Sequence, residues 1–252
     1  MKTICVDTYD QILGIRSDYN YKFENAVLFR GTSNPLVPSL VEKCSFGSYS
    51  DLAYKEHMLL QEFKTYSSLT YQYQNGVPLD WEIRIAAREH GLASSLLDWS
   101  NNIDIAIEFA TYNFISKNID FTSVWILVKS DMDQLEIDGT TKQKYDDINL
   151  PTIINYNLST NYAKYAYSRR KVVQGGFFLK QPYFTIETPL NKNLLFQDRL
   201  TKIFIPKSAI NSIRNSLSET IDLNLTALPS ASNNNSSEIL DDICQRLNSK
   251  YA

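Results

Sequence analysis

The pattern of apolar and polar residues predicts several short strands separated by amphipathic helices. Three continuous apolar runs are typical of strands buried in a sheet. They are residues 27–30 (VLFR), 123–129 (SVWILVK) and 201–205 (TKIFI). Residues 94–99 form a strand or an extended loop, and residues 171–180 have two β-prone halves around a Gln-Gly-Gly segment. Residues 130–168 are polar and weakly periodic, so the pattern does not define their structure.

Apolar residues at spacings of three and four predict helices between and after these strands. The predicted helices are residues 51–66, residues 81–90, a helix from Ile103 to Phe114, residues 206–217 and residues 237–247. Gly91 is placed to end the second helix in the left-handed conformation. The helices cluster after the first strand, the strands dominate later, and no strong linker interrupts the chain. We therefore predict an α+β fold in a single domain, residues 1–252.

Composition and charge exclude several classes of protein. The chain has 252 residues and a formal net charge of −3, which gives no general electrostatic case for binding nucleic acid or an anionic membrane. The two histidines and three cysteines are too scattered to form a local zinc motif or a disulfide scaffold. No window of about 18 apolar residues is present, and Asp7 and Asp10 make the N-terminus a poor signal peptide. We therefore expect a cytoplasmic protein without a metal or a membrane span.

Residues 29–33 are the first stretch with candidate chemistry. Phe29-Arg30-Gly31-Thr32-Ser33 places an arginine at the end of a predicted strand, followed by glycine and two hydroxyls. A guanidinium group offers two parallel donors to a phosphate, glycine lets the backbone approach closely, and hydroxyls reach ribose or phosphate oxygens. The simpler interpretation is a strand that ends in a turn with an exposed arginine.

Asp98 is the centre of the second stretch, residues 90–100. It stands between Leu97 and Trp99, and a carboxylate in apolar surroundings is costly unless it is paired or hydrogen-bonded. Asp98 could therefore orient Arg30 or a substrate hydroxyl. The alternative is that it caps the helix that follows. His90 alone is more often a structural or exposed ring than a catalyst.

Gln174 marks the third stretch, residues 169–178. It stands beside Gly175 and Gly176 in a β-prone segment, and glycines weaken a strand unless another group approaches its backbone closely. That group is a ligand, or the segment is a β-bulge in which Gln174 bonds to a neighbouring residue. The sequence contains none of the P-loop, dinucleotide-binding, nucleophile-elbow and zinc-protease motifs.

Together these stretches resemble the FRG domain, a bacterial family named for its Phe/Tyr-Arg-Gly motif. Residues 28–31 match that motif. Residues 91–99, with Ala106 and Phe109-Ala110, resemble a family block in which Gly-Leu-Pro-Thr-Arg-Leu-Leu-Asp-Trp-Thr leads into Ala-x-x-Phe-Ala. Residues 170–178 resemble the family's Gln-containing strand, and the resemblance covers residues 24–245.

The order of the motifs also resembles that of the ADP-ribosyltransferases, as an analogy. The resemblance implies a mixed or antiparallel sheet core that is split, with an inserted helical section. It implies that Arg30, Asp98 and Gln174 act on NAD, with the Gly31 backbone on the nicotinamide amide and Gln174 on a ribose hydroxyl. The residues that would hold NAD are Phe29, Gly31, Thr32, Ser33, His90, Ser94, Trp99 and Arg170. The implied function is an NAD-consuming effector, a toxin or phage-defence protein, that modifies a protein or nucleic acid in the cell.

The chain also departs from the family pattern. Arg88-Glu89 replace a Gln-His pair, Ser95 replaces an arginine, and Gly175 replaces a second glutamine. These departures favour an alternative, a catalytically degenerate module that binds a nucleotide or a protein through the same cleft. A third hypothesis, a nuclease-like effector, requires a local basic groove around Arg84, Arg88 and residues 169–171.

Overall fold

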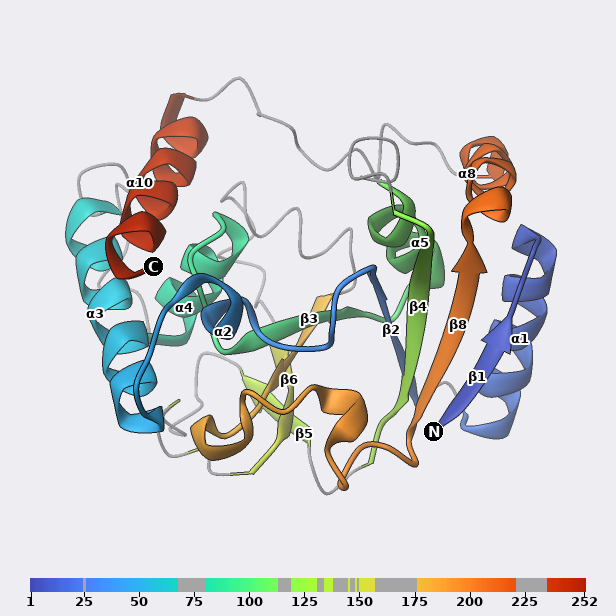
Figure 1. Cartoon of the computed structure of the whole chain (residues 1–252), viewed down its shortest axis with the longest axis horizontal. Helices are drawn as coiled ribbons and strands as arrows, with labels where there is room; N and C mark the ends of the chain where they lie inside the picture. Colours follow the sequence, from blue (N-terminus) through green and yellow to red (C-terminus); the bar gives the residue numbers. More distant parts are fainter. Residues whose placement is uncertain are drawn as a thin grey trace.

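A computed structural model describes residues 1–24, 26–67, 80–112, 119–130, 134–137, 145, 148, 150–156, 176–220 and 235–252. In chain order, the elements are β1 (Lys2–Cys5), α1 (Tyr9–Lys22), β2 (Val27–Thr32), α2 (Ser39–Lys43), α3 (Tyr49–Ser67), α4 (Asp80–Glu89), β3 (Leu96–Ser100), α5 (Ile103–Thr111), β4 (Phe121–Val128), β5 (Gln134–Ile137), β6 (Thr152–Tyr156), β7 (Gly176–Lys180), the 3-10 helices η3 (Tyr183–Thr185) and η4 (Leu190–Lys192), β8 (Leu200–Pro206), α8 (Lys207–Thr220) and α10 (Asn235–Tyr251). Figure 1 shows α3, α4 and α10 gathered on one side of the molecule and α1, α5 and α8 on the other.

The described strands form one mixed sheet in the order β1-β8-β4-β2-β3-β7-β6-β5. The pairs β1–β8 and β5–β6 are parallel, and the other neighbouring strands are antiparallel. The helices α2, α3 and α4 lie in the sequence between β2 and β3. The predicted α+β fold, its mixed sheet and its inserted helical section are therefore confirmed. The likeness to ADP-ribosyltransferases stays a prediction.

The sheet is nearly divided between β2 and β3. β2 pairs with β4 from Val27 to Thr32, but it pairs with β3 only where Phe29 faces Ser100. In Figure 1, β3 runs across the direction of β4 and β8. The two halves, β1-β8-β4-β2 and β3-β7-β6-β5, therefore meet at a single residue pair and diverge beyond it.

Two apolar cores hold the helices in place. The first packs α1, α5 and α8 against the half-sheet of β1, β8, β4 and β2, and it includes Ile12, Phe29, Ile107 and Ile210. The second joins α2, α3, α4 and α10 through side chains such as Phe63. Burying apolar surface at these contacts is the main favourable term for the fold. The helices therefore fix the ends of β2 and β3 from opposite sides.

Most of the predicted elements are confirmed by the structure. The continuous apolar runs form β2, β4 and β8, residues 94–99 contribute to β3, and the predicted helices correspond to α3, α4, α5, α8 and α10. The pattern of residues 130–168 did not define their structure, and β5 and β6 lie there. The elements β1, α1 and α2 were also missed. Phe114 and Gln174 lie outside the described residues.

Within the described ranges, no helix is both long enough and apolar enough to span a bilayer. The same ranges contain no group of three or more His, Cys, Asp and Glu residues that could hold a metal ion.

Candidate functional site

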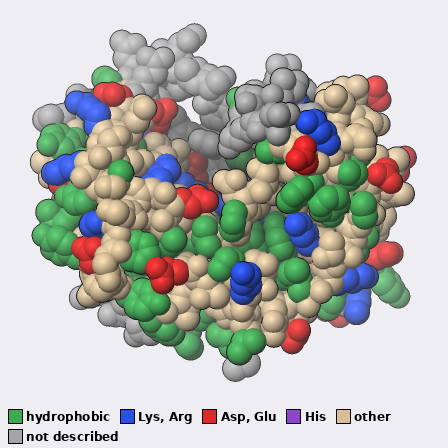
Figure 2. Space-filling view, viewed as in Figure 1, with side chains coloured by type: hydrophobic (Ala, Val, Ile, Leu, Met, Phe, Trp, Pro, Cys, Tyr) green, Lys and Arg blue, Asp and Glu red, His purple; other side chains and the backbone are tan. Residues whose placement is uncertain are grey.

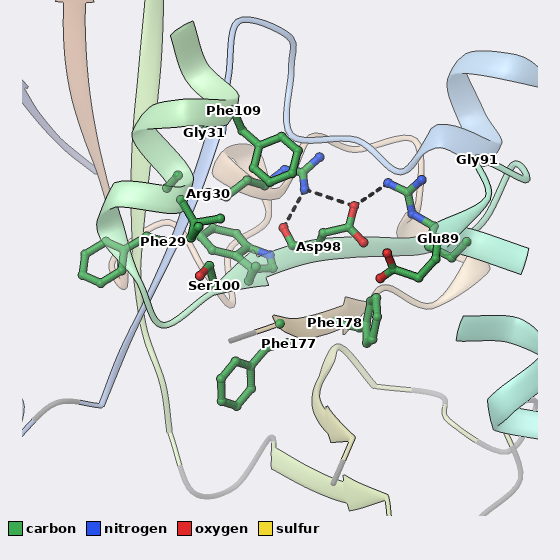
Figure 3. A pocket seen from close by; sticks show the side chains of 15 residues that line it. Phe29, Arg30, Gly31, Glu89, Gly91, Asp98, Ser100, Phe109, Phe177 and Phe178 are labelled. Carbon is green, nitrogen blue, oxygen red and sulfur yellow. Dashed lines mark hydrogen bonds and ion pairs between the residues drawn. The ribbon is translucent and has the colours of Figure 1, made fainter. Parts of the chain in front are cut away.

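A pocket of about 350 Å³ opens where β2 and β3 diverge (Figure 3). Residues from β2, β3, β7, α4 and α5 contribute to its wall. They are Phe29, Arg30, Gly31, Arg88, Glu89, Gly91, Asp98, Trp99, Ser100, Ile105, Ala106, Phe109, Gly176, Phe177 and Phe178. The pocket therefore joins the first two predicted stretches with the end of the third.

Arg30 lies in the gap between the two strands. If the antiparallel register of Phe29 and Ser100 continued, Gly31 would lie opposite Asp98. The strands separate instead, and the Arg30 side chain crosses the gap. Its Nη1 donates a hydrogen bond to the backbone oxygen of Asp98 at 2.5 Å. The guanidinium group therefore satisfies a carbonyl group at the point where the ladder ends.

The Asp98 carboxylate bridges two arginines. Its Oδ2 accepts a hydrogen bond from Nη2 of Arg88 at 2.5 Å and lies 3.8 Å from Nη1 of Arg30. The side chain of Arg30 is 19% exposed and that of Arg88 is 16% exposed, whereas the Asp98 side chain is 46% exposed. Burial lowers the pKa of Arg30, and the nearby Asp98 carboxylate opposes that shift. Asp98 therefore contacts Arg30, as the first of its two predicted roles requires. The alternative that it caps α5 is wrong, because Asn102 does so.

The C-terminal end of α4 places Arg88 and Glu89 in the pocket. Gly91, at φ +84°, ends this helix as predicted. The Leu92 N–H donates to the Ala87 carbonyl at 2.9 Å and the Gly91 N–H donates to the Arg88 carbonyl at 3.0 Å, the two bonds of a Schellman motif. Glu89 points into the pocket in Figure 3. The predicted NAD site included neither residue: Arg88 and Glu89 are departures from the family pattern, and Arg88 is also a member of the hypothesised basic groove.

Three N–H groups in the pocket wall are buried without an acceptor. Within the described parts of the chain, Nε of Arg30, Nε of Arg88 and Nε1 of Trp99 have no hydrogen-bond partner. Trp99 is only 2% exposed. A buried donor without a partner costs about 1–3 kcal/mol, so these three groups destabilise the pocket wall unless they gain an acceptor.

Aromatic rings form much of the remaining wall. Phe109 of α5 is 41% exposed, and Phe177 and Phe178 come from β7. The Lys129 ammonium lies 5.2 Å from the centre of the Phe177 ring, on one side of the pocket. Planar groups pack well against such rings. The pocket therefore combines flat apolar surfaces with guanidinium donors.

Gly31 allows a close approach between two elements of the fold. A Cβ atom at this position would lie 1.7 Å from the Ala106 oxygen and 2.6 Å from the Ala110 nitrogen, which belong to the backbone of α5. The glycine is therefore required by a close approach between β2 and α5. A nicotinamide amide is not needed to explain it, although Gly31 also lines the pocket.

Four other predicted binding residues lie outside the pocket wall. The Thr32 hydroxyl accepts a hydrogen bond from the Asn34 N–H at 3.0 Å, in a local turn, and Ser33 lies in the same turn. Nδ1 of His90 lies 2.7 Å from Oδ1 of Asp241 in α10. Ser94 is buried and its hydroxyl donates to Glu56. None of the four side chains therefore lines this pocket, and their predicted contact with NAD stays a prediction.

Glu56 forms a buried polar centre behind the pocket. This residue of α3 is 1% exposed. It accepts hydrogen bonds from the Ser95 N–H at 2.7 Å, from the hydroxyl of Ser94 at 3.3 Å, from the hydroxyl of Tyr145 at 3.5 Å and from the hydroxyl of Tyr183. Burial, followed by the Glu56 charge, raises the pKa of Tyr183. Glu56 therefore ties the segment leading into β3 to parts of the chain that are distant in sequence.

The other predicted site residues have different outcomes. Phe29, Gly31 and Trp99 join Arg30 and Asp98 in the pocket wall. Gln174 and Arg170 lie outside the described residues. Gly176, two residues after Gln174, lines the pocket.

A basic groove has little support among the described residues. Arg84 is 6% exposed and stacks on the Tyr145 ring at 3.9 Å, so it forms no surface groove. Arg88 is bound to Asp98. On the face shown in Figure 2, Lys and Arg side chains are scattered among acidic and apolar ones. Residues 169–171, the rest of the hypothesised groove, lie outside the described residues, so the nuclease-like effector stays a hypothesis.

Comparison with known families gives one finding. The family model of the FRG domain matches residues 25–118. The matched residues include β2, β3, the helices between them and α5. No curated protein and no solved structure matches the chain.

Proposed function

We propose that the chain is an NAD-consuming enzyme that transfers ADP-ribose to a protein or nucleic acid in the cell, or to water. The observation that carries this proposal is the convergence of Arg30 and Asp98, which lie 68 residues apart in sequence, in one pocket at the split of the sheet. The motif order that suggested NAD chemistry requires this convergence. The setting that we propose for the activity is that of a toxin or phage-defence effector.

The pocket offers suitable surroundings for part of a dinucleotide. Its volume of about 350 Å³ lies near the lower end of the range of about 300–1,000 Å³ for small-molecule sites. Arg30 would bind phosphate oxygens through its guanidinium fork, and Phe109 and Phe177 would pack against a planar ring. A pocket of this size would hold about half of NAD, with the rest reaching its opening.

The proposed reaction breaks the bond between the ribose and the nicotinamide, and positive charge develops on the sugar. The carboxylate of Glu89 lines the pocket and would stabilise that charge. Gln174 remains the predicted ligand of a ribose hydroxyl. Asp98 would keep the guanidinium groups in position, because its carboxylate already binds Arg88 and lies close to Arg30.

The proposal is tested by incubating the purified full chain with NAD and measuring free nicotinamide by chromatography. We expect release by the wild type and at least a ten-fold loss for Arg30→Gln, since one transition-state hydrogen bond to a charged group is worth about 1.5–3 kcal/mol. Arg246→Gln is a matched control, because Arg246 is an exposed residue of α10 that pairs with Asp242 and does not line the pocket. Absence of nicotinamide release by the wild type, with each candidate acceptor and with water, refutes the proposal.

The second candidate is a module that binds a nucleotide without turnover. One observation favours it: the Asp98 carboxylate is held by an arginine at 2.5 Å, so Asp98 is poorly placed to act as an acid or base. Calorimetry with NAD and ADP-ribose distinguishes the candidates. Binding of both ligands without nicotinamide release supports the module and excludes the enzyme.

A further inference from the structure

The arrangement of Arg30, Asp98 and Arg88 leaves many donors unused. Among the described residues, Arg30 donates one hydrogen bond, to the backbone oxygen of Asp98, and Arg88 donates one, to Oδ2 of Asp98. Their Nε–H groups are enclosed without an acceptor in the described part of the chain. One carboxylate oxygen thus serves two cations that can together donate many more hydrogen bonds.

Asp98 is the most exposed member of this group. Its side chain is 46% exposed, whereas both arginine side chains are less than half as exposed. An exposed carboxylate can rotate into water at low cost, and water then screens its charge. The backbones of both arginines belong to regular elements, since Arg30 lies in β2 and Arg88 lies in the last turn of α4. The carboxylate is therefore the part of the bridge that a ligand can replace.

The group best suited to replace it is a phosphate. A phosphoryl group presents three acceptor oxygens and more negative charge than a carboxylate, and guanidinium forks match it in geometry. Trp99 adds a buried indole N–H to the same wall, and it is 2% exposed. Glu89 also lines the pocket and would repel an anion, so the arginine pair would bind the phosphate away from that carboxylate.

We infer that the Asp98 carboxylate is an internal substitute for a ligand phosphate, and that a phosphate or pyrophosphate group binds Arg30 and Arg88 together by displacing it. Arg88 is thereby a binding residue of the site, and Asp98 is a positioning residue that sets the affinity. The inference rests on the proposed function only in that NAD contains a pyrophosphate. The exchange itself requires no turnover.

Calorimetry with inorganic pyrophosphate tests the inference on the full chain. Asp98→Asn removes the competing charge but keeps an oxygen that can accept from Arg88. We expect pyrophosphate to bind this variant about ten-fold more tightly than the wild type, a value well below the Coulomb limit because Asp98 is partly exposed. Asp242→Asn, on exposed α10, changes the net charge equally and should leave the affinity unchanged. Arg88→Gln should weaken binding at least ten-fold.

A thermal unfolding series keeps the test independent of the variants' own stability. Asp98→Asn can unfold at a lower temperature than the wild type, but its midpoint should rise further when pyrophosphate is added. The inference is overturned if wild type and Asp98→Asn bind pyrophosphate equally, or if neither binds it. Pyrophosphate exchange without nicotinamide release refutes the proposed enzyme alone. Nicotinamide release without any effect of Asp98→Asn on pyrophosphate binding refutes the exchange alone.

Discussion

Replacing Gly31 with alanine should lower the free energy of unfolding more than a conservative substitution on the surface does. The added Cβ would lie 1.7 Å from the carbonyl oxygen of Ala106. Carbon and oxygen atoms ordinarily approach no closer than about 3.3 Å, so β2 and α5 would have to separate by roughly 1.5 Å. Neither side can adjust by rotating a side chain, because the atoms of α5 that would be met are backbone atoms.

The size of the effect follows from what holds the two elements. β2 is paired with β4 along its full length, and α5 packs in the apolar core beneath it. Overpacking a core costs about 1–3 kcal/mol when side chains can adjust. We expect Gly31→Ala to lower the free energy of unfolding by at least about 3 kcal/mol, a large fraction of a typical stability of about 5–15 kcal/mol.

Urea unfolding followed by circular dichroism measures this change, and the chain offers a matched control. Gly14 lies inside α1 with no atom within 4 Å of an added Cβ. Gly14→Ala should therefore stabilise the protein by about 0.5–1 kcal/mol, since alanine is the better helix former. If Gly31→Ala unfolds at the wild-type urea concentration, the close approach of β2 and α5 does not require glycine. Ligand binding would then again be the better explanation for this residue.

Three further predictions concern the thiols, one acidic residue and one helix cap. Iodoacetamide at pH 8 should label exposed Cys5 but leave Cys44 and Cys244 unmodified in the folded protein. The reason is that burial raises the pKa of both buried thiols, that of Cys244 to about 12. Mass spectrometry before and after unfolding counts the labelled cysteines. Hydrogen bonds from α10 lower the pKa of Glu62, so its stabilising effect is complete above its usual pKa of 4.5 and is lost as the pH falls through the lower folded value. Glu62→Gln should accordingly flatten the acid side of a stability profile from pH 3 to 7, and an unchanged slope would contradict this. Asn102→Ala should lower the free energy of unfolding by about 1 kcal/mol, measured with urea, because it removes the side-chain cap of α5.

The fold could be predicted where one physical signal dominated. β4 and β8 are long apolar runs and α8 carries a clear apolar stripe, so burial alone identifies them. β5 has four residues and little apolar character, and it exists because β6 pairs with it. α1 was missed for another reason. Its apolar stripe is weak, but Thr8 and Gln11 form a capping box that was present in the sequence and not used.

The site could be predicted only in part, because a short stretch of sequence does not show which distant residues the fold brings together. Arg30 and Asp98 were found as unusual polar residues in apolar company. Arg88 and Glu89 gave no such signal, since charged residues at the end of a helix are ordinarily solvated. Phe109 and Phe177 resembled core residues. Gly31 was recognised as a close-approach glycine, but the sequence could not show that the approaching backbone is α5.

The same close approach explains why the pocket exists. Gly31 lets β2 lie tightly against α5, and the β2–β3 ladder ends at Phe29 and Ser100. The carbonyl of Asp98 then lacks its strand partner, and Arg30 supplies the missing donor. Arg30 is therefore fixed in place by the fold before any ligand arrives, which lowers the entropy lost on binding. Lysine cannot replace Arg30 at the end of this ladder, because one ammonium group does not reproduce the planar fork of the guanidinium.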